Sequence, residues 1–113
     1  MATPECTVIT VAGEIDIAAK EQFFSVLSEN LAPGEALVLD LAEVTFLDSG
    51  GLWALLKAAK HATATGAEML VVASPAVSRT LALTQTSHFL ALHHDRASAV
   101  QAGAVHDRPQ QDE

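Results

Sequence analysis

Three short apolar runs recur along the chain, and a segment with helical periodicity follows each of them. The runs are CTVITV, ALVLDL and EMLVVA, over residues 6–11, 36–41 and 68–73. The first alternates and is rich in β-branched residues, which favour strands, while the other two are apolar enough to be buried on both faces. Strands that alternate with helices predict an α/β fold, with a mixed, mostly parallel sheet covered by helices.

The segments between these strands carry the start and stop signals of helices. We expect helices over about 17–31, 49–65, 75–84 and 95–102, and a short strand near 89–92. Gly66 is a natural helix end, and Ser74 followed by Pro75 is a strong helix start. The apolar stripes of these helices and the apolar strands predict a buried core: Phe23, Leu27, Leu39, Leu52, Leu55, Leu56 and Val71.

The length of 113 residues suits one domain with one core. We predict that this domain occupies residues 1–104 and that 105–113, VHDRPQQDE, form a flexible polar tail. A single cysteine, Cys6, leaves no internal disulfide and suits a reducing compartment. No run of about 18 apolar residues exists, and the opening MATPEC lacks a basic region followed by an apolar one. Neither a membrane span nor a signal peptide is predicted, and the expected location is cytoplasmic.

The formal charge of −8, from 14 acidic and 6 basic residues, argues against a nucleic-acid surface. Such a surface needs clustered lysines and arginines to displace counterions, whereas the basic residues here are scattered singly, so no direct contact with DNA or RNA is expected. His88, His93 and His94 lie close in sequence. Neighbouring residues of a strand point to opposite faces, however, so neither a metal nor another cofactor is predicted.

The segment VTFLDSGGLWALL, residues 44–56, changes character within four residues. An apolar run stops at Asp48 and Ser49, two glycines follow, and leucines at helical spacing continue. A serine at a helix N-terminus lies beside unpaired N–H groups, where the helix dipole favours a phosphate. Gly50 and Gly51 carry no side chain that would obstruct the backbone of another protein. An accessible modification site accounts for both features. The alternative is that Ser49 or Asp48 is merely an N-cap and that the glycines form a tight turn.

The longer segment LVLDLAEVTFLDSGGLWALLKAAK resembles the STAS domain of anti-sigma factor antagonists. The hallmark of that family is an apolar strand, a short link, and then Asp-Ser-(small)-Gly-Leu at the start of a helix. The upstream GEID and the downstream strand, Ser-Pro and helix occur in the family's order and spacing. The resemblance therefore covers roughly residues 5–102.

The resemblance implies that Ser49 is phosphorylated by a partner that is both a serine kinase and an anti-sigma factor. Many members have a second hydroxyl residue where this chain has Gly50, so Ser49 is the single matched hydroxyl here. The family role of Asp16, in GEID, is that of an acidic neighbour of the phosphorylation site. From the residues alone Asp16 is equally an N-cap of the first helix, and one residue can serve both roles. The partner is therefore expected to contact Asp16, Asp48, Ser49, Gly50 and Gly51.

Four-residue spacing places Ser49, Trp53, Lys57 and His61 on one stripe of the predicted helix. An aromatic ring and cations beside a modification site suit a protein partner, because Trp is frequent at interface hot spots. Trp53 and Lys57 are therefore predicted to contact the partner. The alternative is that Trp53 packs against a neighbouring helix while the lysines are solvated.

These residues leave three functions open. The first is a non-catalytic module that binds an anti-sigma factor serine kinase and so releases a sigma factor. The second keeps the fold without the switch, as a constitutive accessory subunit, for example of a lipid transporter ATPase. The third is a small serine hydrolase with Ser49 as nucleophile. It is disfavoured, because L-D-S-G-G departs from the G-x-S-x-G elbow and nothing in the sequence places a histidine beside Ser49. The chain is not predicted to be an enzyme.

Overall fold

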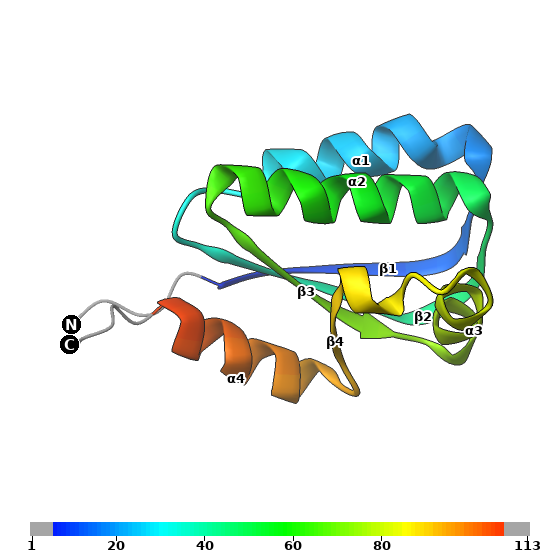
Figure 1. Cartoon of the computed structure of the whole chain (residues 1–113). Coiled ribbons are helices and arrows are strands. Elements are labelled where there is room, and N and C mark those ends of the chain that lie inside the picture. The colour runs from blue at the N-terminus through cyan, green and yellow to red at the C-terminus, as the bar shows by residue number, and fades with distance from the viewer. Residues whose placement is uncertain (1–5, 108–113) are drawn as a thin grey trace.

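Four parallel strands form the central sheet of the computed structural model, which describes residues 6–107 (Figure 1). They lie side by side in chain order as β1 (Cys6–Ile15), β2 (Ala36–Leu47), β3 (Glu68–Ala73) and β4 (Ala91–His93). The helices are η1 (Ile17–Ala19), α1 (Lys20–Glu29), α2 (Ser49–Thr65), α3 (Pro75–Thr84), η2 (Ser87–Phe89) and α4 (Arg96–Asp107). The α/β prediction is confirmed, and every strand pair of the described residues is parallel rather than mixed.

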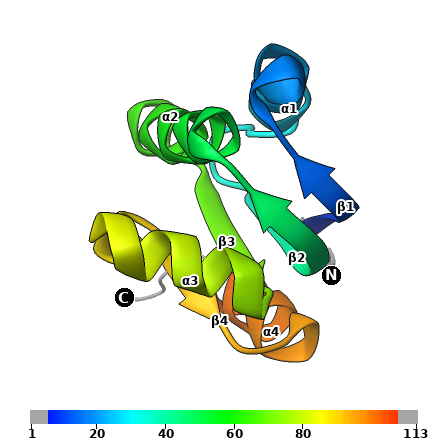
Figure 2. The same cartoon turned by 90° about the vertical axis from the view of Figure 1, so that its right-hand side faces the viewer.

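Helices cover both faces of this sheet. α1 and α2 lie side by side over one face, and α4 lies against the other (Figure 1, Figure 2). Connections between adjacent parallel strands are right-handed, so the crossovers from β1 to β2 and from β2 to β3 place α1 and α2 on the same face. α3 lies at the end of the sheet where β2 and β3 finish (Figure 2). The start of α2 is at this same end.

Alternate residues of β2 point into two separate clusters. Leu37, Leu39 and Leu41 belong to the larger cluster, which lies under α1 and α2. The smaller cluster lies under α4 and consists of Ala36, Val38, Leu70, Val72 and Ala99. A salt bridge of 2.9 Å from Arg96 Nε to Asp40 Oδ2 also fastens α4 to the sheet. The runs 36–41 of β2 and 69–72 of β3 are therefore buried on both faces, as predicted, whereas β1 and β4 are largely exposed or half-buried.

The helix α2 begins and ends where the sequence predicted. Asp48 is its N-cap, and the Asp48 carboxylate accepts a hydrogen bond of 3.0 Å from the Gly51 N–H. Gly66, with φ of 82°, ends the helix in the left-handed region that favours glycine. At α3, Ser74 Oγ accepts a hydrogen bond of 3.1 Å from the Val77 N–H. Local capping chemistry thus sets the limits of both helices.

The beginning of the first helix differs from the prediction. The chain first forms η1, and α1 follows with Ala19 as its N-cap and no side-chain cap hydrogen bond. Asp16 instead accepts the Ala19 N–H through its backbone carbonyl, at 3.0 Å. The prediction that Asp16 is the N-cap was therefore wrong, because three residues of η1 separate it from α1. β1 and β2 also run further than expected, to Ile15 and Leu47.

Each residue of the predicted core is buried except Leu56, which is half-buried. α4 runs past the predicted helix end at Ala102 and continues to Asp107. Residues 108–113 of the predicted tail lie outside the described residues. Between residues 6 and 107, no helix combines the length and the apolar character needed to cross a membrane.

Candidate functional site

The ends of β1 and β2 meet at the start of α2. Ile15 pairs with Leu47 in the parallel register, and the Ile15 carbonyl accepts a hydrogen bond of 3.2 Å from the Asp48 N–H. Asp16 and Ser49 are the next residues on the two segments that this bond joins. The structure therefore brings the segment of Asp16 to the segment of Ser49, although they lie far apart in the sequence.

A third element holds the same corner of the fold. Thr80, on α3, donates its hydroxyl to the Leu47 carbonyl at 3.2 Å. The Leu52 N–H donates to the Asp48 carbonyl at 2.9 Å and closes the first turn of α2. Hydrogen bonds from β1, from α3 and from its own cap thus fix the position of the start of α2.

Ser49 is the first residue of α2 and is exposed, whereas Asp48 is half-buried and holds the cap. The first N–H groups of a helix have no partner within the helix, and the dipole gives this end a partial positive charge. Asp16 is exposed as well. An accessible hydroxyl therefore lies at the positive end of a helix, with one acidic residue beside it in sequence and a second on the adjoining segment.

The two glycines at the start of α2 are packed into the fold, and their contact with a partner stays a prediction. Gly50 and Gly51 are buried, so neither offers open backbone to a partner in the isolated domain. A Cβ on Gly51 would lie 2.5 Å from Leu47 Cδ1 and 2.9 Å from the Ile15 carbonyl oxygen. Contacts this short force the neighbouring atoms to shift, and the Ile15 carbonyl is backbone, which shifts less easily than a side-chain end. Gly51 is glycine because α2 starts in direct contact with the ends of β1 and β2.

Phe46 is a site residue that the sequence analysis missed. It lies near the end of β2, pairs with Glu14 in the register, and is 50% exposed. Phe46 and Leu47 are adjacent on a strand, so they point to opposite faces, and Leu47 is the buried one. The sequence does contain a signal for this exposure: Phe46 and Leu47 are adjacent apolar residues at a strand end, and only one of them can face the core. A large exposed ring thus stands three residues before Ser49.

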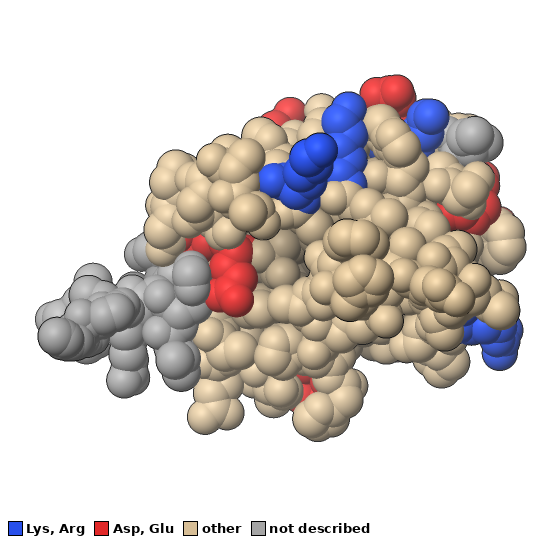
Figure 3. Space-filling model, viewed as in Figure 1, with Lys and Arg blue, Asp and Glu red and all other residues tan. Residues whose placement is uncertain are grey.

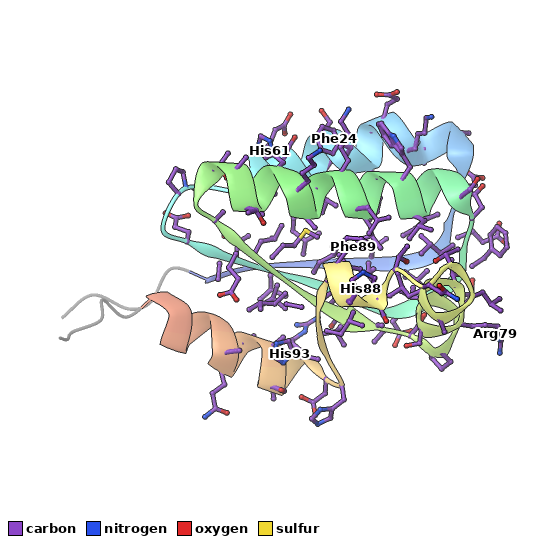
Figure 4. The ribbon with its side chains drawn as sticks, viewed as in Figure 1. Phe24, His61, Arg79, His88, Phe89 and His93 are labelled. Atoms are coloured by element: carbon purple, nitrogen blue, oxygen red, sulfur yellow. The ribbon has the colours of Figure 1, made fainter. Side chains whose placement is uncertain are left out.

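Trp53 packs between two helices. Basic side chains gather over α1 and α2 in Figure 3. The rings of Phe24, Trp53 and His61 lie close to Lys20 and Lys57. The centroids of Trp53 and Phe24 are 6.1 Å apart, and His61 meets Phe24 edge-on at 6.2 Å (Figure 4). Lys20 Nζ lies 4.7 Å and Lys57 Nζ 4.5 Å from the Trp53 ring centroid, within the range of cation–π attraction.

This arrangement matches the alternative for Trp53, which is half-buried against a residue of α1. The lysines are nevertheless not simply solvated, since Lys57 also lies 4.9 Å from the Phe24 ring centroid. Lys57 itself is exposed. Trp53 therefore has a packing role, and whether Trp53 and Lys57 also contact a partner stays a prediction.

The three clustered histidines make contacts with residues close to them in sequence. The rings of His88 and Phe89 lie 4.1 Å apart, and His94 Nε2 lies 3.1 Å from Asp95 Oδ2. His93 Nδ1 lies 3.1 Å from Ser98 Oγ on α4. Among the described side chains, no group of three histidines, cysteines or acids is placed to hold a metal ion. None of these contacts places His88, His93 or His94 beside Ser49 as a general base.

Comparison with known proteins identifies the family. The model of the STAS domain matches residues 2–99, so this chain belongs to the STAS domain family. Among solved structures, the chain is similar to an anti-sigma factor antagonist from Mycobacterium paratuberculosis. The sequence identity is 28%, the match covers 91% of this chain and 89% of the other, and the TM-score is 0.77. The predicted resemblance is therefore confirmed.

Two further structures show the same fold at lower identity. One is the anti-sigma factor antagonist SpoIIAA in its unphosphorylated form, with 21% identity, coverage of 90% and 91% of the two chains, and a TM-score of 0.64. The other is the STAS domain of a SulP transporter from Vibrio cholerae, with 20% identity, coverage of 90% and 84%, and a TM-score of 0.62. The fold thus occurs both in anti-sigma factor antagonists and in a transporter.

Proposed function

We propose that this protein is an anti-sigma factor antagonist whose binding is switched by phosphorylation of Ser49. The partner is an anti-sigma factor that is also a serine kinase, and its capture by the unmodified protein releases a sigma factor. The protein acts by binding and is not itself an enzyme. Its similarity to the antagonist from Mycobacterium paratuberculosis supports this proposal, as does the family to which it belongs.

The observation that carries the proposal is the exposure of Ser49 at the first residue of α2. A kinase can reach this hydroxyl without unfolding the domain, because the cap is made by Asp48 and not by Ser49. The surface around it includes exposed Asp16 and the exposed ring of Phe46. A partner that covers Ser49 would also cover these two residues.

Phosphorylation changes the charge of this surface far more than its fold. A phosphate adds nearly two negative charges and a hydrated group. The helix N-terminus offsets part of that charge, by about 0.3 to 1 kcal/mol. Asp48 opposes it: at about 6 Å and an effective dielectric of about 40, a carboxylate repels a divalent phosphate by roughly 3 kcal/mol before salt screening. A partner must in addition remove water from the phosphate, so the main cost falls on binding.

A phosphotransfer assay tests the proposal. The wild-type protein is used to capture its partner from native lysate, and the captured protein is then incubated with ATP and fresh antagonist. We expect phosphate on the wild type and on Ser78→Ala, an exposed serine of α3 that serves as the control. We expect none on Ser49→Ala. Labelling of Ser49→Ala, or a captured protein without kinase activity, would refute the switch.

A constitutive accessory subunit is the second candidate, and similarity to a transporter STAS domain favours it. In that role, for example beside a lipid transporter ATPase, Ser49 would stay unmodified. The capture experiment separates the two functions. Recovery of a transporter ATPase, equally by the wild type and by Ser49→Asp, would support the second.

A further inference from the structure

An apolar groove lies between α2 and η2, away from the start of α2. Its volume is about 670 Å³. The α2 wall includes Leu56, the one predicted core residue that is only half-buried, and Ala59, while Lys60 stands at the rim. The opposite wall is Phe89, which is 61% exposed and lies on η2 beneath α2 in Figure 4. Two large apolar side chains thus remain accessible in one concave surface.

Charge is divided unevenly along the chain, and the groove lies in the positive part. Between Ser49 and His94 the single acidic residue is Glu68, whereas the other acidic residues all lie outside this segment. The same segment supplies α2, α3 and η2, and it contains Lys57, Lys60 and Arg79. A protein with a formal charge of −8 therefore builds this groove from a segment of net positive charge. Most of the front surface in Figure 3 is uncharged; basic side chains lie along its upper part, and acidic side chains are visible at its left and right sides.

The α2 wall of the groove lies on the helix face that carries Ser49, apart from the stripe of Trp53, Lys57 and His61 that faces α1. Leu56, Lys60 and Thr63 follow Ser49 at intervals of seven, eleven and fourteen residues, which is the spacing of one helix face. At about 1.5 Å per residue, Lys60 lies roughly 16 Å along α2 from Ser49. This distance is about two Debye lengths at physiological salt, so a charge at Ser49 has little direct effect on the groove.

We infer that the groove between α2 and η2 receives an acidic, amphipathic helix of the protein partner that covers Ser49. Apolar side chains of that helix fill the space between Leu56 and Phe89, and its carboxylates approach Lys60 at the rim. The α2 wall consists of side chains at helical spacing, which suits the ridges of a second helix. The inference rests on the proposed function, because it gives the same partner a second contact. Phosphorylation of Ser49 should have little electrostatic effect on this second contact.

A synthetic peptide tests this contact without the kinase. The probe is a helical peptide with leucines at i, i+3, i+4 and i+7 and glutamates at the flanking positions. Its control has lysine in place of each glutamate. Titrated into the whole ¹⁵N-labelled protein, the acidic peptide should cause saturable amide shifts at Leu56, Ala59 and Phe89, and the lysine peptide should not. No saturable shift at these residues, or equal binding of both peptides, would overturn the inference.

Two variants and one control locate the contact. Lys60→Glu should lower the affinity for the acidic peptide at least about fivefold, and Phe89→Ser should lower it similarly, since both side chains are exposed at the groove. Circular dichroism checks that both variants are folded. Lys20→Glu makes the same charge change on α1 and should alter the affinity less than about twofold. Equal effects of Lys60→Glu and Lys20→Glu would overturn the inference, because they would indicate a general charge effect.

A vesicle experiment tests the alternative that the groove binds an anionic membrane. The protein should not sediment with phosphatidylserine vesicles, given its net charge of −8. Sedimentation that Lys60→Glu abolishes would assign the groove to a membrane and overturn the inference.

The experiments distinguish failure of the groove contact from failure of the proposed phosphorylation switch. A kinase that phosphorylates Ser49 while the acidic peptide does not bind refutes only the groove contact, and a groove that binds the peptide without any kinase partner refutes only the switch.

Discussion

Asp48 is joined to Ile15 by a backbone hydrogen bond of 3.2 Å, which runs from the start of α2 to the end of β1. This bond places Asp16 on the segment next to Ser49, and it leaves no room for a side chain at Gly51. The proposed phosphorylation site therefore lies where α2 begins in contact with β1 and α3. Substitutions at and near this position test the packing of the domain and its binding to a partner.

Gly51→Ala should destabilise the domain by about 1 to 3 kcal/mol, the usual cost of forcing an extra methyl group into packed surroundings. The added Cβ would meet Leu47 and the Ile15 carbonyl. Urea unfolding followed by circular dichroism measures the effect, with exposed Ser49→Ala as the control, expected within about 0.5 kcal/mol of wild type. Unchanged stability of Gly51→Ala would show that α2 does not start against β1.

Leu55→Ala should cost about 2 to 5 kcal/mol, because Leu55 is fully buried between α2 and the sheet. Leu56→Ala is the matched comparison one residue further on. It should cost less, since Leu56 is half-buried and lines the groove. A larger loss for Leu56 than for Leu55 in the same unfolding experiment would mean that the register of α2 is wrong.

Trp53→Ala should lower the free energy of unfolding by about 1 to 3 kcal/mol and leave the domain folded, because the ring is half-buried against Phe24. We also expect weaker binding of the captured kinase, in calorimetry, if the exposed part of the ring contacts it. Trp53→Phe keeps an aromatic ring there and should retain most of both properties. A Trp53→Ala protein that is unfolded at room temperature would assign this residue to the core alone.

Lys57→Glu should weaken kinase binding while changing the unfolding free energy by less than about 1 kcal/mol, since exposed cation–π contacts are small. Lys57→Arg preserves the charge and the contact with the rings of Trp53 and Phe24, and should bind normally. The chain has one tryptophan and no tyrosine, so its fluorescence reports the surroundings of Trp53 in both variants. Unchanged kinase affinity of Lys57→Glu would remove Lys57 from the proposed interface.

The helices and strands could be predicted well because their signals are local. The start of α2 at Asp48 and Ser49, its end at Gly66 and the start of α3 at Ser74 are each encoded within a few residues, and the structure reproduces all three. Which of Asp48 and Ser49 makes the cap was left open, and it is Asp48. Asp16 failed as a cap because η1 intervenes, which no local signal distinguished from an immediate helix start. From its sequence context alone, Gly51 was expected to leave room for the backbone of a partner, whereas the structure buries it.

Features that depend on contacts between distant segments were not predictable in the same way. The restriction at Gly51 comes from Ile15, on another strand, and the exposure of Phe46 depends on which face of β2 the sheet buries. The groove joins Leu56 to Phe89, from two elements separated by β3 and α3. Sequence periodicity marks the face of a helix, but it does not say which other element completes a concave surface.

The affinity of the captured kinase for Ser49→Asp is the most direct test of the proposed switch. Isothermal titration calorimetry compares this variant with the wild type and with Ser49→Ala, after circular dichroism has shown that all three are folded. We predict that Ser49→Asp binds at least about tenfold more weakly than the wild type, because a desolvated negative charge opposes the partner, and that Ser49→Ala binds normally. Equal affinity of Ser49→Asp and the wild type would contradict control of binding by the charge at Ser49.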